Sequence, residues 1–573
     1  MASTPSDTST RTAQGKEASR FPIWKTTPGL PDAQGGETSK PGIGENRKRQ
    51  SDHSLPIYSL RLVPVALIVV AFSCYFCSVY FPGVDDAYIS LRYALNFFRG
   101  DGLIWNPGQE AVQGYSNLLY TLLLSVGFLF FDKYQIYEWA FVINVLAGIG
   151  VVLVLFRFFR SSNRLGEGAA LTMAYLLALC PALSYWIWSG METIPVLFLQ
   201  VLVWIAVQTI VDKKERNGSL LFIGASVLLV LSRADGFVMP VFGVAYLALV
   251  QRQVRTACIL GGIVALTFVS LALWQHAYYG DWLPNTVRAK VQDGTLPERI
   301  LVALKMLFVT FSVRGTEIPH TPFFFRLGLW LPLLAVTCHA FVVIRKDGFK
   351  GLPFPSFFVW AWLLYWIRNG GDHFDDRFLV LWWPAGLYSA VWLSNLPARH
   401  SYRCRLLVIL TVSLVYALSM IPSQPGGYNA YSFKAWPKDL YDHVRQLADL
   451  LNRRYNGEYI AVIGAGYLPY FSGNPAVDCL GLNDRTIACT PAAFQFPGHN
   501  KHNEQYLMSR RPKVIFTTPI SELDSNDPQM LTGGHLSLYE SNGYRWVDLW
   551  TGRILDPRTG GDSNISPALV RQD

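Results

Sequence analysis

The residues best suited to chemistry gather directly after the first long apolar stretch, in FPGVDDAYISLRYALNFFRGDGLIWNPGQEAVQGYSN at 81–117. This segment opens with the adjacent acids Asp85 and Asp86. Transfer of a sugar to a hydroxyl needs a base that takes the hydroxyl proton, and one carboxylate can do this while its neighbour holds a metal or the sugar. The alternative is a helix N-terminus, where the helix dipole favours acids. Aromatic and polar side chains accompany the acids and favour the catalytic interpretation, with Asp85 preferred to Asp86 as the base although the residues themselves barely separate the two. They include Tyr88, Arg92 and Tyr115.

Two further loops carry charge beside an apolar stretch. Glu192 lies in WSGMET, just before a span, and either caps a helix or contacts a sugar hydroxyl. Arg233 and Asp235 lie in SRADG, where they either pair across a tight turn or bind substrate. An exposed pair of this kind contributes little to stability.

The loop YYGDWLPNTVRAK at 278–290 combines an interface-type aromatic turn with Asn285, Arg288 and Lys290. A polyprenyl-phosphate donor would bring an anion whose leaving phosphate gains charge in the transition state, and cationic side chains or a metal must stabilise it. We therefore expect Arg288 and Lys290 to contact the phosphate. Contact with lipid head groups is the alternative.

The loop NGGDHFDDR at 369–377 places Asp372, His373 and Arg377 between two apolar spans. So much charge in a short loop favours a substrate-binding network. An acid–histidine cluster could also bind a divalent cation, although no spacing here is diagnostic of a metal site. A solvated loop is the third interpretation. No cofactor is predicted with certainty.

Composition shows what must position these loops. The chain has 573 residues, of which 51% are hydrophobic and 16% charged, whereas a soluble protein averages about 25% charged. Several apolar runs are long enough to cross a bilayer, which predicts a polytopic membrane protein. The net charge of +9 is accounted for by basic loops and does not call for a nucleic acid.

We predict eleven membrane-spanning helices, with 118–131 lying along the outer surface because its 14 residues are too few for a span. With 118–131 on the outer surface, every second loop between spans is basic and is therefore predicted to be cytoplasmic. Arg47, Lys48 and Arg49 predict that the N-terminus is cytoplasmic too. The acidic loops and the C-terminal region then lie outside. The predicted spans are 57–80, 136–156, 168–187, 193–211, 218–231, 236–250, 256–276, 323–344, 355–368, 378–396 and 405–421.

Three regions follow from the change in composition. Residues 1–55 hold few large apolar side chains and predict a disordered cytoplasmic tail. Residues 56–421 form the membrane domain, with 81–135 as its first outer loop. Residues 422–573 alternate helical patterns with short apolar strands, which predicts an extracytoplasmic α/β domain. Its GAG at 464–466 is weak evidence for a nucleotide and is better explained as a turn onto a packed helix. Cys479 and Cys489 could pair there, although spacing does not decide this.

These loops, in this order and together with GYLPYFSGNPAVDCLGLNDRTIA and FPGHNK, resemble the GT-C membrane glycosyltransferases of the mycobacterial terminal β-1,2-arabinofuranosyltransferase family over about residues 57 to 520. The resemblance implies a GT-C fold in the bacterial cytoplasmic membrane. It also implies inverting transfer of a sugar, arabinofuranose in the best-known members, from polyprenyl phosphate to a cell-envelope glycan or glycolipid. Asp85 would be the base, and the C-terminal domain would help to bind the acceptor. SRADG has Ala234 where we expect Pro in relatives.

A transporter or flippase of lipid-linked sugars is the competing class. Such a protein usually carries charged groups near the bilayer midplane. The interiors of the predicted spans contain no Asp or Lys, and Glu138 lies at an outer end. This distribution favours chemistry at the membrane surface, on a substrate embedded in membrane lipid.

Overall fold

The computed structural model divides the chain into Met1–Leu55 and Pro56–Asp573. The residues described are 55–80, 82–161, 165–291, 294–308, 323–372, 377–396, 401–419, 440–492, 501–516, 536–555 and 567–572. The predicted tail 1–55 therefore lies almost wholly outside the described residues.

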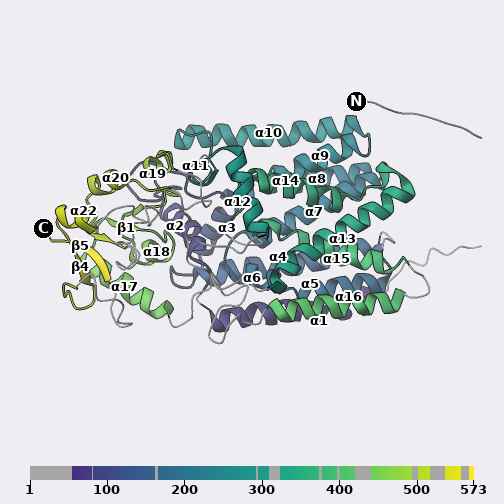
Figure 1. The fold of residues 1–573 in the computed structure, drawn as a ribbon, viewed down its shortest axis with the longest axis horizontal. Helices are drawn as coiled ribbons and strands as arrows, with labels where there is room; N and C mark the ends of the chain where they lie inside the picture. The colour runs from purple at the N-terminus through teal and green to yellow at the C-terminus, as the bar shows by residue number, and fades with distance from the viewer. Residues whose placement is uncertain are drawn as a thin grey trace, which may run out of the picture. The chain divides into compact units, whose positions relative to one another are not determined.

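Long apolar helices make up most of the second unit (Figure 1). Five described helices are long and apolar enough to cross a membrane, or six if one bent pair counts as a span. Neighbouring helices such as α7 and α8 pack side by side. The five are α1 (Leu55–Val79), α4 (Ile136–Ser161), α7 (Thr193–Val211), α8 (Glu215–Ser232) and α10 (Val254–Tyr279).

The predicted span 168–187 is broken, which corrects the expectation of one continuous helix. It consists of α5 (Glu167–Ala178) and α6 (Pro181–Trp188), bent by 48°. Pro181 is the first residue of α6, and its missing N–H and its ring prevent the chain from continuing α5. α3 (Leu118–Gly127) has 10 residues, too few for a full span, as its sequence predicts.

Several of the remaining helices begin or end at the loops that carry the candidate site. α2 (Asp85–Arg99) is amphipathic, and Gly100 ends it in the left-handed conformation. The other elements are α9 (Val238–Leu249), α11 (Asn285–Val291), α12 (Leu296–Phe308), α13 (Phe323–Asp347), η1 (Phe349–Gly351), α14 (Phe354–Arg368), η2 (Arg377–Leu379), α15 (Trp382–Ser394) and α16 (Ser401–Ser419).

A mixed five-stranded sheet with short helices forms the C-terminal part, at the end of the unit opposite the long helices (Figure 1). The order is β2-β1-β3-β5-β4; β1 pairs in parallel with β2 and β3, whereas β5 is antiparallel to β3 and β4. The strands are β1 (Ile460–Val462), β2 (Ala476–Asp478), β3 (Val514–Ile515), β4 (Tyr544–Asp548) and β5 (Pro567–Arg571). The helices are α17 (Leu440–Arg454), α18 (Tyr467–Ser472), α19 (Arg485–Cys489), α20 (Glu504–Ser509) and α22 (Leu536–Ser541).

Candidate active site

The first acid of α2 lies against the C-terminal part of the chain. The Asp85 carboxylate accepts hydrogen bonds from the backbone N–H of Gly466 at 2.9 Å and of Tyr467 at 2.8 Å. Burial raises the pKa of Asp85 to about 7, helped by the negative charge of Asp86 and opposed by the two N–H groups. A carboxyl group with such a pKa is suited to take up and release a proton near neutral pH.

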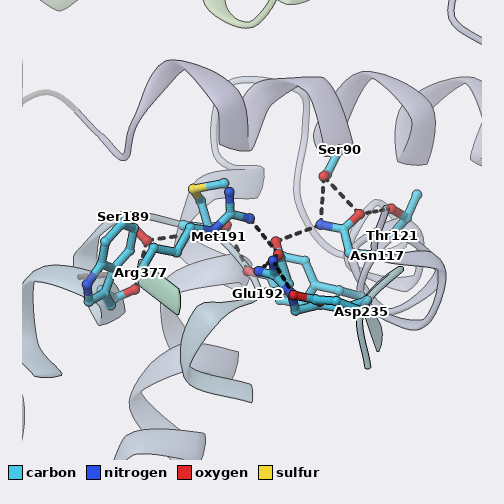
Figure 2. A network of polar contacts seen from close by, with 12 residues as sticks. Ser90, Asn117, Thr121, Ser189, Met191, Glu192, Asp235 and Arg377 are labelled. Carbon is cyan, nitrogen blue, oxygen red and sulfur yellow. Dashed lines mark hydrogen bonds and ion pairs between the residues drawn. The ribbon is translucent and has the colours of Figure 1, made fainter. Parts of the chain in front are cut away.

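A buried ionic cluster lies near the start of α2 and consists of Glu192, Arg233, Asp235 and Arg377. The carboxylate of Glu192, 1% exposed, contacts Arg233 at 3.0 Å and Arg377 at 2.6 Å. Arg233 also pairs with Asp235 at 2.7 Å. Figure 2 shows Glu192 together with Arg377 and Asp235. Burial disfavours the charged carboxylate, but Arg377 and Arg233 outweigh it and lower the pKa of Glu192 to about 2. The cluster is therefore ionised and rigid at neutral pH.

This arrangement corrects one of the two alternatives for Glu192. Its side chain makes no capping hydrogen bond to α7. Its carboxylate pairs with Arg233 and Arg377, and contact with a sugar hydroxyl stays a prediction. The pairing of Arg233 with Asp235 is confirmed, but it is largely buried and joined to Glu192 instead of being an exposed turn contact.

Hydrogen bonds connect this cluster to α2. Asn117 donates to Glu192 at 2.8 Å and exchanges hydrogen bonds with Ser90 of α2 (Figure 2). The N–H of Val84, the residue before Asp85, donates to the carbonyl of Ser189 at 3.0 Å. Hydrogen bonds therefore connect the start of α2, which carries Asp85, to the loop that contains Glu192 at two separate points. No residue-type pattern singled out Ser90 or Asn117, because neutral side chains of this kind are common throughout the chain.

A cavity of about 380 Å³ opens beside the cluster and brings together the predicted residues Arg233, Asp235, Lys290, Asp372 and Arg377. Asp372 is 4% exposed, and its charge favours the cationic form of Arg233. Most of the wall is apolar. The sequence did not indicate several further polar lining residues, because they lie at helix ends or inside a predicted span: Gln275, Tyr365, Arg368 and Asn369.

Three other predicted substrate residues hold the chain together instead of lining this cavity. Tyr88, 2% exposed, packs on Tyr467 with ring centroids 4.7 Å apart. Arg92 donates to the carbonyls of Trp105 and Asn474, each at 2.9 Å. Tyr115 shares a hydrogen bond with Tyr279 at 3.0 Å. Their polar and aromatic character reflects contact between distant segments.

The YYGDWLPNTVRAK loop divides between two environments. Asn285 is buried and donates to the carbonyl of Gly481 at 2.8 Å. Arg288 forms an ion pair with Asp281 and does not line the cavity, whereas Lys290 does. In this structure the expectation of a phosphate contact therefore suits Lys290 better than Arg288.

His373 lies outside the described residues. Within those residues, no group of three or more His, Cys, Asp and Glu side chains is placed to hold a metal ion. Cys479 is buried and Cys489 exposed, and both are unpaired thiols.

A second cavity, of about 250 Å³, lies between the first outer loop and the C-terminal sheet. Its walls are polar and aromatic. From the outer loop come Trp105, Asn106, Gln109, Glu110 and Val112, and from the C-terminal part Tyr459, Ala476, Val477, Asn483, Asp484, Arg485, Thr486, Tyr506 and Arg510.

Part of this chain is similar in sequence to a curated protein. The chain is 27% identical over 335 residues to the terminal β-(1→2)-arabinofuranosyltransferase of Mycobacterium tuberculosis. The match covers 52% of this chain and 50% of the curated relative, so it spans about half of each. Residues 436–565 match a family described as a domain of unknown function, DUF8728.

Two crystal structures of ArnT from Cupriavidus metallidurans align with part of this chain. One is bound to undecaprenyl phosphate and one is in the apo state. Each aligns with a TM-score of 0.47, at 12% and 13% identity respectively. The alignments cover 74% of this chain and 85% and 86% of the two ArnT chains.

Proposed function

We propose that this protein is an inverting membrane glycosyltransferase with a GT-C fold and eleven membrane crossings. It transfers a sugar from a polyprenyl-phosphate donor to a hydroxyl of a cell-envelope glycan or glycolipid, on the extracytoplasmic face. The observation that carries the proposal is the position of Asp85. This carboxylate stands at the head of α2, which is hydrogen-bonded to the ionic cluster of a largely apolar cavity with cationic groups.

The cavity suits a lipid phosphate. Its apolar wall, which includes Phe268 and Leu271, can accept the first isoprene units. Lys290 and Arg368 supply positive charge that is not consumed by the buried Glu192 cluster. Charge held in place before the reaction stabilises the phosphate as its bond to the sugar breaks.

Asp85 acts as the base in the transfer. The acceptor oxygen attacks the anomeric carbon from the face opposite the phosphate, and its proton passes to the Asp85 carboxylate. The bond between the anomeric carbon and the phosphate oxygen breaks, and its electron pair leaves with the polyprenyl phosphate. The configuration at the anomeric carbon inverts, and Asp85 later releases the proton to water.

The second cavity suits the acceptor. Sugars are bound by stacking on aromatic rings and by hydrogen bonds to fixed polar groups, and both are present there in Tyr459, Tyr506, Asp484 and Arg485. We place the acceptor glycan in this cavity, between the first outer loop and the C-terminal sheet. An arabinofuranose donor is the specific case suggested by the mycobacterial relative.

Substitution of Asp85 tests the proposal directly. With a labelled polyprenyl-phosphate sugar and a glycan acceptor in detergent, Asp85→Asn should lower kcat by about 10²–10⁴-fold and leave donor binding intact. Asp86→Asn should have the smaller effect. Turnover of Asp85→Asn at the wild-type rate would contradict the assignment. Product formed without vesicles also separates a transferase from a flippase, which needs two compartments.

A further inference from the structure

A segment nearly four hundred residues away in sequence supplies both hydrogen bonds to the Asp85 carboxylate. The N–H of Gly466 reaches Oδ2 at 2.9 Å, and the N–H of Tyr467 reaches Oδ1 at 2.8 Å. Each carboxylate oxygen has two lone-pair sites. Both oxygens are therefore held while one site on each stays available to a substrate proton.

The approach of this segment depends on its glycines. A Cβ at position 466 would lie 1.8 Å from the backbone oxygen of Asp85, and one at position 464 would lie 3.2 Å from Oδ2. Gly466 has a negative φ of −93°, so it is not in the left-handed region that favours glycine. The close contact with α2 is the reason that a side chain is not accommodated at this position.

The segment is anchored on both sides of the carboxylate. The Tyr467 hydroxyl donates to the carbonyl of Gly83, and its ring packs on Tyr88. Two residues further along α18, the carbonyl of Pro469 accepts from the buried guanidinium of Arg92. These contacts fix the loop to α2 before any substrate binds.

We infer that the loop 464–467 is a positioning element for the base: its two N–H groups hold the Asp85 carboxylate in the orientation that proton transfer needs. The C-terminal part of the chain thus completes the active site as well as lining the acceptor cavity. This inference rests on the proposed function, because it takes Asp85 as the base.

The charges near the Asp85 carboxylate explain why hydrogen bonds from the loop are needed to stabilise its ionised form. The charges that face Asp85 are the acids Asp86 on α2 and Asp478 at the end of β2, and the phenols Tyr88 and Tyr467 lie beside them. Both acids disfavour ionisation of Asp85. The two N–H groups provide the opposing, stabilising interaction.

The test compares glycine substitutions that differ in how far they displace the loop. Gly466→Ala should lower kcat by about 10–100-fold, as expected for a misplaced catalytic group. Gly464→Ala should lower it less, because Oδ2 needs to yield only slightly. Binding of a fluorescent polyprenyl phosphate should stay within about twofold of wild type, since the loop does not line the donor cavity. The matched control is Gly262→Ala in α10, where nothing lies within 4 Å.

The outcomes separate this inference from the proposed function. The inference about the loop is overturned if Gly466→Ala has the wild-type kcat. It is also overturned if the kcat of this variant is higher, because the loop would then be an inhibitory lid. If Gly466→Ala does not fold, Gly464→Ala decides by the same criterion. In an Asp85→Asn background, Gly466→Ala should cause no further loss. An active Asp85→Asn enzyme defeats the proposed base, whereas an inactive one beside fully active glycine variants defeats the loop alone.

Discussion

At the scale of single residues, Glu192 has the strongest link to stability. Its carboxylate is buried between two arginines, and removing one partner of such a cluster leaves uncompensated charge in the protein interior. Glu192→Gln keeps the volume and removes the charge, and should lower the free energy of unfolding by about 3–5 kcal/mol. Thermal unfolding in detergent measures this, with the exposed Glu138→Gln of α4 as the control. Equal melting of the two variants would show that the cluster is not stabilising.

A second residue-scale prediction concerns pH. The pKa of Asp85 is raised to about 7 by burial, with Asp86 adding to the shift and the N–H groups of Gly466 and Tyr467 opposing it. A base must be deprotonated, so kcat/KM should fall as pH drops below about 7. Asp86→Asn removes a like charge, and should move this acid limb to lower pH. A limb that stays near pH 4, the usual range of a free carboxyl group, would contradict the burial of the base.

The sequence identified residue types correctly but could not name their partners. The charges of Glu192, Arg233 and Arg377 were recognisable in separate loops, yet their mutual contact depends on how three helices end. Tyr88 and Arg92 were predicted at a ligand surface because they are polar and aromatic. Those same properties suit a tightly packed contact between segments, and composition does not separate the two.

At the scale of elements, the two cations predicted to contact phosphate, Arg288 and Lys290, lie on different faces of α11. Residues two apart do not share a helix face: Lys290 lines the large cavity, whereas Arg288 pairs with Asp281. Lys290→Ala should raise the KM for the donor by about tenfold, the value of one charge-assisted hydrogen bond. Arg288→Ala should change this KM much less. Equal increases in a steady-state assay with varied donor would show that both side chains reach the phosphate.

Local pattern predicted the elements well where they are long or strongly periodic. The helix expected over 439–455 is α17, and the expected strands at RPKVIFTTP and YRWVDLW contain β3 and β4. β2 and β5 were not predicted, and strand length alone does not explain this, because the predicted β3 has only two residues. The bend at Pro181 was missed because hydropathy averages over a window and overlooks a single missing N–H.

At the scale of the whole molecule, contacts between the first outer loop and the C-terminal part could not be predicted. GAG after a strand indicated only a tight turn, and nothing local to it points to an acid at the start of α2. Long-range choice of partner depends on the complete packing arrangement. The close approach of Gly466 to Asp85 follows only from the folded structure, in which the C-terminal part packs on the start of α2.

Arg92 provides the test of this long-range contact. Its guanidinium is 4% exposed and donates to backbone carbonyls on both sides, those of Trp105 on the outer loop and of Pro469 and Asn474 on the C-terminal part. Arg92→Lys keeps the charge but cannot reproduce the planar fork, and each buried carbonyl left without its donor should cost about 1–3 kcal/mol. Proteolysis within 440–516 should become faster and kcat should fall, because the loop over Asp85 loses its anchor. Arg99→Lys, exposed in the last turn of the same helix, is the matched control. If both variants resist protease equally, the C-terminal part is held by other contacts, and the dependence of the base on it would have to be weaker than the geometry indicates.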